Sequence, residues 1–547
     1  MSDPPPPQTL GFVKGLTVLF TLGALTLATH AFYNLYLHPL ARVPGPFLAR
    51  ISGLPSWYHA YRGDRHIWLL RQFEAYGNRI RPEPDTVLFR DSQAQAEIYG
   101  MKSNVRRSRF YQAFKRADRE ETTMTLIDVA AHARRRRHLT ACFTEKSIRA
   151  ACTFVVDHVN RWLQITVEEN DLDAKEWSAP IDFSAWIDAL IFDIMGDLSF
   201  GRSFNIKEPG DNPLKSTPHN IASWMKFYYL MCRFPFIRLL LWLKPRGLDR
   251  VLDALTPPEA RQYNQFVTDS VTRRIALQRA QSERPEAEQR HDMFHFMASA
   301  RDPATGAPVY DDFELRAESN LLIIAASDTT SISLSGIIFY LTSDAARCER
   351  LTKEIRSTFS SVDEIVYGPK LSACTYLRAC IDEGMRLTPS GPSELPREVL
   401  PGGLQIKGEF YDAGTIVGTV PWANSRNVEV YGADATVFRP ERWLPLDPQE
   451  EPEGATPEAL RRARAGFHPF LSGPGNCIGQ NLAMAQMLIT VARMLHRLDI
   501  RRAPGSTFGG GEAALGWGRD DPAQFQVTDA YISLRRGPEV QFRKRRD

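Results

Sequence analysis

The stretch of sequence that most constrains this chain is a glycine- and proline-rich loop that ends in a single cysteine. Phe470 opens the loop, Gly473 and Gly475 form its centre, and Cys477 closes it. A stretch with helical periodicity, QNLAMAQMLI, follows from residue 480. Free backbone N–H groups and the positive end of the dipole at a helix start stabilise a thiolate. The sequence therefore predicts a thiolate that is presented at the start of a helix.

The glycines of this loop would let a flat ligand approach the cysteine. Gly473 and Gly475 permit turn conformations that are closed to other residues, and Gly479 would let a planar group lie against the helix start. A thiolate offered to a planar partner suits an axial ligand of haem iron. The alternative is an ordinary buried thiol in a turn, because free cysteine is often buried.

Four residues of the loop, Phe470, Gly473, Cys477 and Gly479, resemble the cysteine-ligand loop of the cytochrome P450 haem-thiolate monooxygenases. The chain departs at Gly475, where the family usually carries a basic residue. The resemblance implies a mainly α-helical haem-thiolate fold with a small β-rich lobe (α+β). It also implies haem b as the cofactor, Cys477 as the ligand of its iron, and Phe470 and Gly479 as cofactor-binding neighbours.

The N-terminal part of the chain predicts a membrane anchor. Residues 1–9 are polar and proline-rich, which is typical of a disordered tail. Residues 10–33 are almost wholly apolar and long enough to cross a bilayer as a helix. A cleaved signal peptide would need a basic start and a small-residue cleavage site, which the acidic, proline-rich start does not offer. Basic residues cluster after the segment and predict a cytosolic domain.

The rest of the chain divides into a short linker and one large domain. Residues 34–50 are a proline-rich linker, and residues 51–547 are the haem-thiolate catalytic domain that the resemblance implies. A net charge of +3 is too small to argue for a nucleic-acid partner. Seven cysteines without paired spacing argue against a disulfide framework or a zinc site. The resemblance to membrane-bound fungal members implies a single-pass protein of the endoplasmic reticulum membrane.

A long helix is predicted from about Asp311 to Leu341, with Glu314 completing a capping box at its start. Asp328 and Thr329 are a polar pair within its apolar part, where a locally satisfied aspartate is the simpler interpretation. The pattern resembles the family's oxygen-activation helix, which implies a catalytic role in proton delivery for Asp328 and Thr329. By position, the predicted pocket wall is Leu322, Ala325, Ala326 and Leu395, and the predicted lid is Phe110, Tyr111, Phe114 and Met124.

Basic side chains elsewhere are predicted to hold the propionates of the cofactor. His132 and Arg136 stand where the family has an aromatic residue, usually Trp, and a basic residue four positions later. Arg397 resembles the strand arginine that reaches a propionate. The neighbouring Arg134, Arg135 and Arg137 are expected on the surface, either as a solvated helix face or as a docking site for an acidic electron donor.

A carboxylate and a guanidinium, Glu383 and Arg386, lie one turn apart on the next predicted helix. On these residues alone, the pair is a surface ion pair of small energy. The family buries the pair and completes it with a later arginine. Arg439 and Arg442 are the candidates here, and the family pattern favours Arg439. The implied role of this trio is structural, because it holds the loop that presents Cys477.

Three other stretches carry expectations about structure. Residues 80–89 predict the first strands of a small sheet. Residues 106–128 have no steady period and predict a flexible loop. Residues 227–242 are very apolar and predict a lip that dips into the membrane, with ordinary protein core as the alternative.

The reaction that the resemblance implies is insertion of one oxygen atom of O2 into a small apolar organic substrate, with electrons from NADPH through NADPH–cytochrome P450 reductase. Two other classes remain open. A haem-thiolate isomerase or dehydratase that uses peroxide would not need Asp328 and Thr329. A membrane haem sensor or carrier would need neither a proton relay nor a substrate channel. Resemblance to fungal secondary-metabolism members favours a terpenoid, polyketide or alkaloid substrate.

Overall fold

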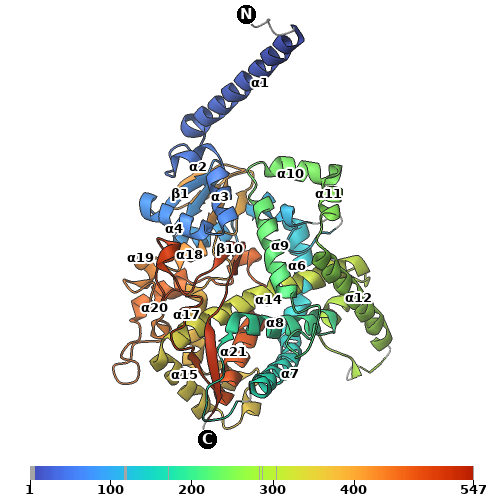
Figure 1. Ribbon diagram of the computed structural model, residues 1–547, viewed down its shortest axis with the longest axis vertical. Coiled ribbons are helices and arrows are strands. Elements are labelled where there is room, and N and C mark those ends of the chain that lie inside the picture. The colour runs from blue at the N-terminus through green and yellow to red at the C-terminus, as the bar shows by residue number, and fades with distance from the viewer. Residues whose placement is uncertain are drawn as a thin grey trace, which may run out of the picture.

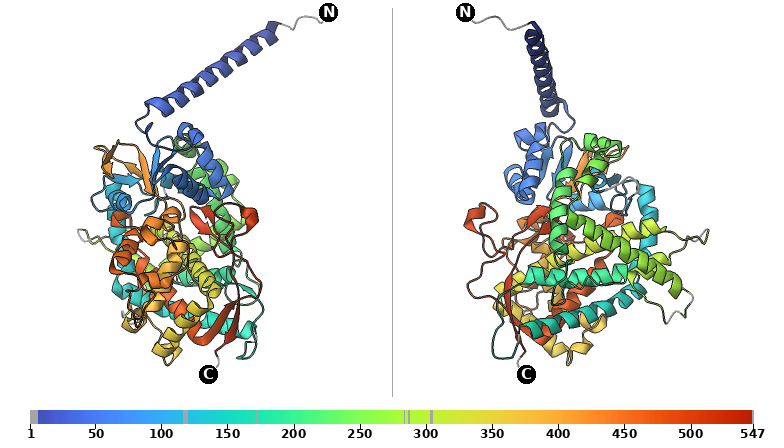
Figure 2. Two further views of the ribbon diagram at one scale, coloured as in Figure 1. Left: turned by 90° about the vertical axis from the view of Figure 1, so that its left-hand side faces the viewer. Right: turned by 45° about the vertical axis from the view of Figure 1, so that its right-hand side comes forward.

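The computed structural model describes residues 7–115, 120–170, 172–282, 284–285, 288–302 and 305–545. Helix α1 (Pro7–Phe32) projects from a mainly helical body that carries a small sheet lobe (Figures 1 and 2). The stretch Leu16–Leu37 is apolar and long enough to cross a membrane, and none of its hydrophobic window is buried. Residues 1–6 of the predicted tail lie outside the described residues, whereas residues 7–9 are helical.

The linker is packed on the sheet lobe rather than extended. It begins with a π-helical turn, η1 (Tyr33–Leu37), and its last residues already belong to helix α2 (Phe47–Ile51). Arg81 holds it in place, because its Nη1 donates to the carbonyl of Asn34 at 2.8 Å and its backbone N–H donates to Pro44 at 2.7 Å. These contacts from the sheet order the linker.

The sheet lobe joins segments that are far apart in the sequence. Its five strands are arranged in the order β1 (Arg79–Glu83), β2 (Thr86–Phe89), β8 (Ile416–Thr419), β5 (Arg397–Val399) and β3 (Val105–Arg107). All neighbours pair antiparallel except β2 and β8. The first two strands confirm the prediction for residues 80–89. The pairing of β3 with β5 also sets Arg107 opposite Arg397.

The helical body is built around α14 (Asp312–Ser343), which crosses it from side to side (Figure 1). The helix packs against α8 (Phe183–Phe200) and α17 (Thr375–Leu387). The predicted capping box is present, because Asp311 and Glu314 each accept the other's backbone N–H. Although α14 is apolar and long enough to span a membrane, 72% of that window is buried. It is therefore the core helix of the body.

The close packing of α14 on α17 depends on Gly384. A Cβ at this position would overlap the side chain of Ile337 on α14. The cysteine loop leads into α21 (Gln480–Arg497). This helix packs against α7 (Glu145–Glu169). The contacts of α14 with α17 and of α21 with α7 fix the elements that carry the candidate site.

The remaining elements surround this frame. They are α3 (Leu54–Arg62), α4 (Arg65–Tyr76), α5 (Ser92–Tyr99), η2 (Arg109–Phe114), α6 (Val129–Leu139), η3 (Thr140–Phe143), β4 (Ile181–Asp182), α9 (Thr217–Cys232), α10 (Ile237–Leu243), η4 (Lys244–Arg246), α11 (Leu248–Ala254), α12 (Pro258–Gln281), α13 (Met293–Ala298), α15 (Ala345–Thr358), η6 (Val362–Glu364), α16 (Pro369–Ser372), β6 (Leu404–Ile406), β7 (Glu409–Tyr411), α18 (Pro421–Asn424), α19 (Val428–Tyr431), η7 (Pro440–Trp443), α20 (Pro457–Gly466), η8 (Gly473–Gly475), β9 (Leu498–Arg502), η9 (Ala513–Leu515), β10 (Thr528–Ala530), β11 (Ile532–Leu534) and β12 (Glu539–Lys544).

The prediction of a flexible loop at residues 106–128 is wrong for the first part of this range. Strand β3 ends at Arg107, and the 3-10 helix η2 (Arg109–Phe114) follows it. The aromatic residues that broke the sequence period order this part by burial: Phe110 packs edge-on against Tyr229 with ring centroids 6.3 Å apart. Residues 116–119 of the predicted loop lie outside the described residues.

The apolar stretch at residues 227–242 is divided between surface and core. Tyr229 and Cys232 of α9 are buried, whereas Phe236, Leu239 and Trp242 are more than half exposed. The exposed side chains belong to α10 and the turn before it, at the end of the body from which α1 projects (Figure 1). The α9 part of this stretch is therefore ordinary core, and the membrane contact of the exposed part stays a prediction.

Candidate active site

The cysteine loop has the shape that its glycines allow. Gly473 has φ +63°, and a Cβ there would overlap the backbone carbonyl of Tyr99. The loop is closed by a hydrogen bond of 2.8 Å from the Cys477 N–H to the carbonyl of Phe470. Helix α21 begins three residues after the cysteine, with Gly479 as its N-cap. The predicted cysteine at a helix start is thus confirmed as a geometric feature.

Cys477 faces an internal space rather than bulk water. It is the one exposed residue among the seven cysteines of the chain. Burial nevertheless raises the pKa of its thiol, against the opposing effects of the Gly479 N–H and Arg136. A side chain that is accessible and yet surrounded by protein borders a cavity. A metal cation at the sulfur would deprotonate the thiol despite the raised pKa.

Gly479 leaves room beside the sulfur. A Cβ at Gly479 would stand 3.9 Å from the Cys477 Sγ and 3.5 Å from a ring carbon of Phe143. These are ordinary contact distances, so the protein alone does not require glycine at this position. The missing side chain leaves open a surface on which a planar ligand of the cysteine can lie, and Phe470 is partly buried in the same loop.

On α14, the two residues of the predicted catalytic pair have different surroundings. The Thr329 Oγ1 donates to the carbonyl of Ala325 at 2.8 Å, and Ala325 is exposed within the largely buried middle of α14. Asp328 is 5% exposed, and its Oδ2 has no hydrogen-bond partner. Burial and the nearby Asp188 raise the pKa of Asp328 to about 7, against the effect of Arg535. The carboxyl can therefore exchange a proton near neutral pH.

Residues of the predicted pocket wall lie along the same helix. Ala325 is exposed, Ala326 is partly buried, and Leu322 is buried at 6% exposure. Ala325 and Thr329 are one turn apart, so they share a face of α14. Leu322, one further turn towards the N-terminus, continues that face. This arrangement is consistent with an opening beside α14, although the individual contacts to a substrate stay predictions.

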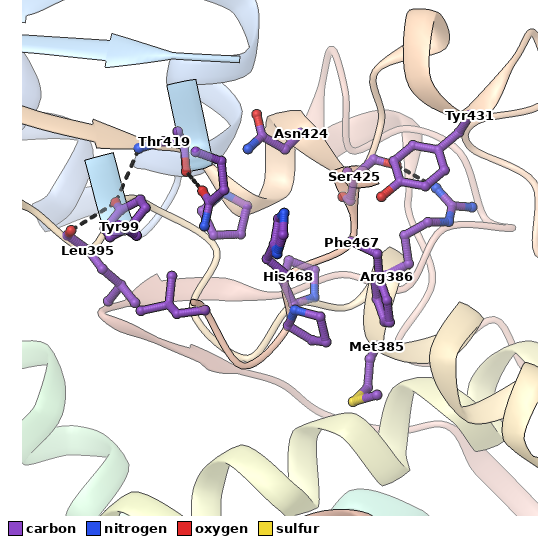
Figure 3. A pocket seen from close by; sticks show the side chains of 16 residues that line it. Tyr99, Met385, Arg386, Leu395, Thr419, Asn424, Ser425, Tyr431, Phe467 and His468 are labelled. Carbon is purple, nitrogen blue, oxygen red and sulfur yellow. Dashed lines mark hydrogen bonds between the residues drawn. The ribbon is translucent and has the colours of Figure 1, made fainter. Parts of the chain in front are cut away.

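Leu395 lines a cavity beside the start of the cysteine loop (Figure 3). The Tyr99 hydroxyl donates to the carbonyl of Leu395 at 3.0 Å and accepts from the backbone N–H of Thr419 at 3.3 Å. His468, two residues before Phe470, projects into this cavity between Leu395 and Asn424 (Figure 3). The cavity thus separates the sheet lobe from the start of the cysteine loop.

Three guanidinium groups gather near the cysteine loop. Arg136 on α6 donates to Asn476 Oδ1, and Arg397 on β5 donates to the Tyr111 hydroxyl at 3.3 Å. The third is Arg107 on β3, which sequence reasoning did not identify. Burial and these three arginines lower the pKa of His132 to about 3, which places all four groups within electrostatic reach of one another.

The arginines of this cluster have no ion-pair partner in the part of the chain that the structure describes. Among the residues that the structure describes, no carboxylate forms an ion pair with Arg107, Arg136 or Arg397; the nearby Glu398 pairs instead with Arg106 at 3.0 Å. The Nε2 of His132 is also buried without a hydrogen-bond partner. Unpaired charges in such a place are costly unless an anion joins them. The cluster therefore fits a ligand with carboxylates, such as the two propionates of haem.

Gly475, which stands in place of the family's basic residue, lies directly against this cluster. A Cβ at Gly475 would be 2.9 Å from the Nη2 of Arg397. Its φ lies outside the left-handed region, so the backbone itself would accept another residue. Arg397 therefore occupies the space into which a side chain at position 475 would begin to grow.

The predicted structural trio forms, but with a different arginine. Glu383 and Arg386 are fully buried and joined by two bonds of 2.8 Å. The Nε of Arg442 lies 3.3 Å from the Glu383 carboxylate, whereas Arg439 reaches it only through its backbone N–H, at 2.9 Å. The choice of Arg439 is wrong. The turn of η7 directs Arg442 inward and leaves the Arg439 side chain near the surface, paired with Asp434.

The surface arginines of α6 also need a correction. Arg135 is not a surface charge, because it pairs with Glu314 and lies 3.3 Å from the buried Glu318, both on α14. Arg134 and Arg137 are exposed, as predicted. The run of four arginines does not show which of them are exposed, because the helical register decides which side chains face α14.

Comparison with known proteins gives concordant results. The family model described as Cytochrome P450 matches residues 74–508. The curated cytochrome P450 monooxygenase poxM of Penicillium oxalicum is 31% identical over 98% of this chain and 96% of its own length. The monooxygenase fscF of Fusarium equiseti is 32% identical over 97% of both. The crystal structure of a cytochrome P450 (CYP102L1) matches with a TM-score of 0.66 at 17% identity, covering 88% of this chain and 94% of that one.

Proposed function

This chain belongs to the cytochrome P450 family, and from that premise we propose that it is a membrane-anchored monooxygenase acting on a small apolar organic substrate. The reaction inserts one oxygen atom of O2 into the substrate. The observation that carries the proposal is Cys477, a single cysteine at a helix start that is accessible from an internal space. Relatives from Penicillium and Fusarium, matched over 96% and 97% of their length, bear the name monooxygenase.

Haem is the cofactor that the family implies, and the residues present fit it. Cys477 would hold the iron, Gly479 would leave the face of the ring free, and Arg136, Arg397 and His132 would meet the propionates. When bound, haem supplies the binding and activation of O2, with a thiolate that favours cleavage of the O–O bond. The protein's part is to position the substrate and to control protons.

Asp328 and Thr329 would provide that control. A pKa of about 7 lets Asp328 take up and release a proton at neutral pH. The Thr329 hydroxyl donates its hydrogen to Ala325, which leaves its oxygen free to accept a hydrogen bond from a water in the pocket. Together they would deliver protons to oxygen at the site.

The membrane role rests on two features at one end of the molecule. Helix α1 leaves the body beside α2, and α10 lies at the same end (Figures 1 and 2). Phe47 and Leu48 of α2, with Leu239 and Trp242 of α10, are all more than half exposed. We propose that α1 spans the endoplasmic reticulum membrane once and that these side chains dip into its cytosolic leaflet.

The electron source and the substrate are narrower parts of the proposal. NADPH–cytochrome P450 reductase would supply electrons, and the exposed Arg134 and Arg137 of α6 are candidates for its acidic surface. The relatives named above come from fungi, which supports a secondary metabolite such as a terpenoid, polyketide or alkaloid.

The test is oxygen consumption by microsomes that contain the full chain. The proposal predicts consumption that requires both NADPH and the reductase and that is matched by an oxygenated product. A peroxide-driven isomerase or dehydratase would turn over without the reductase. A haem sensor or carrier would bind haem and consume no oxygen. Either result would replace the monooxygenase proposal.

A further inference from the structure

Arg107 is held at the inner edge of the sheet lobe by bonds that leave its charge unpaired. It donates to the carbonyl of Thr123 and, at 3.3 Å, to the carbonyl of Met124. Its guanidinium lies over the ring of Tyr111, 5.6 Å from the centroid. Burial and the neighbouring Arg397 lower the pKa of Arg107 to about 10. A guanidinium placed among other guanidiniums is a costly arrangement for a structural residue.

Its neighbour Arg106 shows what an ordinary arginine on this strand does. Successive side chains of a strand point to opposite faces, and Arg106 pairs with Glu398 at 3.0 Å on the outer face. Arg109 approaches the same carboxylate at 3.8 Å. Glu398 thus pairs with the outer arginines, Arg106 and Arg109. None of the described carboxylates forms an ion pair with Arg107.

Arg107 lies near Gly475, the position at which this chain has no basic side chain. Strand β3 pairs with β5 so that Arg107 lies opposite Arg397. Arg397 in turn fills the space next to Gly475, with its Nη2 2.9 Å from where a Cβ would stand. A ligand carboxylate in this cluster meets no cation from position 475, because that position has no side chain. Arg107 is the additional cation that the cluster contains.

Arg107 also connects the cluster to the backbone at Thr123. The N–H and the hydroxyl of Thr123 both donate to Oε1 of Glu318, at 2.7 and 2.9 Å. Glu318 is fully buried on α14, eleven residues before Thr329. Thr123 is therefore held on one side by Arg107 and on the other by the helix that carries the candidate catalytic pair.

We propose that Arg107 is a cofactor-anchoring residue that replaces the basic residue missing at Gly475, and that it couples the bound cofactor to the backbone of residues 120–128. The proposal rests on haem being the cofactor. A propionate neutralises the guanidinium, so that Arg107 can hold the Thr123 and Met124 carbonyls without a net unpaired charge. Residues 120–128 are then ordered from the cofactor side as well as from α14.

The experiment uses the haem-loaded full chain and two matched variants, Arg107→Gln and Arg106→Gln. Transfer of haem to apomyoglobin measures release, and hydrogen exchange measures protection of the amides in residues 120–128. A charge-assisted hydrogen bond predicts roughly ten- to a hundred-fold faster release for Arg107→Gln. The same variant should exchange its 120–128 amides faster, while Arg106→Gln should match the wild type in both measurements.

The outcomes separate the inference from the proposed function. Wild-type release by Arg107→Gln would overturn the inference, and so would faster release with unchanged exchange at residues 120–128. If Arg107→Gln does not fold, Arg107→Lys keeps the charge but not the forked geometry, and it should release haem at an intermediate rate; a wild-type rate would contradict the proposal. A wild-type chain that binds no haem would overturn the proposed function as well.

Discussion

Two groups of arginines in this protein differ in whether their charges are paired. Around Glu383, the guanidiniums of Arg386 and Arg442 share one fully buried carboxylate, and Trp443 donates to it at 3.0 Å. Burial opposes ionisation of Glu383, yet Arg386 and Arg442 keep its pKa below the ordinary value. Near the cysteine loop, Arg107, Arg136 and Arg397 have no carboxylate among the described residues.

The difference separates a structural cluster from a binding cluster. Buried charges in a finished structural network are paired and hydrogen-bonded. The network at Glu383 meets this condition within the protein itself, so it holds the fold. The cluster near Cys477 would meet it only with a bound anion, so it fits an anionic ligand. The same residue type therefore has two roles, and the presence of a carboxylate decides between them.

The largest expected effect comes from breaking the paired cluster. Glu383→Gln should destabilise the protein by about 3–5 kcal/mol, because it leaves the buried guanidinium of Arg386 without its anion and Arg442 with Asp434 alone. Thermal unfolding and the yield of folded protein measure the loss. Arg439→Gln is the matched control, because Arg439 contributes only its backbone N–H to Glu383. Equal losses in the two variants would contradict the assignment of Arg442.

Asp328 is the reverse of the unpaired arginines, because it is a buried acid for which the described residues provide no ion-pair partner. Arg535 already pairs with Asp188, and the pKa of Asp328 is raised to about 7. Because the folded protein binds this proton more tightly than the unfolded chain does, the group's contribution to stability falls as pH rises from about 4 to 7. Asp328→Asn should remove that fall, which is worth on the order of 4 kcal/mol over the whole range and about 3 kcal/mol between pH 5 and pH 8. Denaturant unfolding at pH 5 and pH 8 measures it; parallel curves for variant and wild type would place the pKa elsewhere.

Breaking the unpaired cluster should affect the cofactor rather than the fold. Arg136→Ala and Arg397→Ala should each release haem roughly ten- to a hundred-fold faster, from the loss of a charge-assisted bond worth ~1.5–3 kcal/mol. Gel filtration with absorbance measures haem retention, and far-UV circular dichroism should show helicity largely kept. Full retention in both variants would mean that these arginines do not hold the cofactor.

The smallest effect is expected where a charge is added. Gly475→Arg should change haem retention little on its own, because Arg397 already fills the adjoining space and must move aside. In the Arg397→Ala background that space is free, so Gly475→Arg should restore retention towards the wild-type level. Haem release from the single and double variants measures this rescue. No rescue would show that position 475 cannot reach the ligand.

Sequence patterns predicted the parts of the site that depend on local chemistry. The turn glycine Gly473, the capping box at Asp311 and the cysteine at a helix start are each set by neighbours in the chain, and the structure has them as expected. The expectation for Gly475 is wrong, because its φ is one that any residue can adopt. The choice between Arg439 and Arg442 depended on a single 3-10 turn, and the pattern gave the wrong residue. Arg107 was missed because its role depends on pairing with a strand almost 300 residues later.

The order of residues 109–114 escaped prediction for a related reason. Their aromatic side chains have no helical or strand period, yet Phe110 and Tyr111 are each 3% exposed. They are buried by Tyr229 and Tyr531, which come from distant parts of the chain. Partners supplied by tertiary contacts leave no local signal.

The central claim is that Cys477 is the thiolate ligand of haem iron, and one spectrum tests it most directly. The reduced, carbon monoxide-bound protein should show the shifted Soret band of a thiolate-ligated ferrous haem. Cys477→Ser should lose that band together with turnover, because a serine cannot supply the thiolate. If Cys477→Ser kept the band, another residue would be the ligand and the account of this site would be wrong.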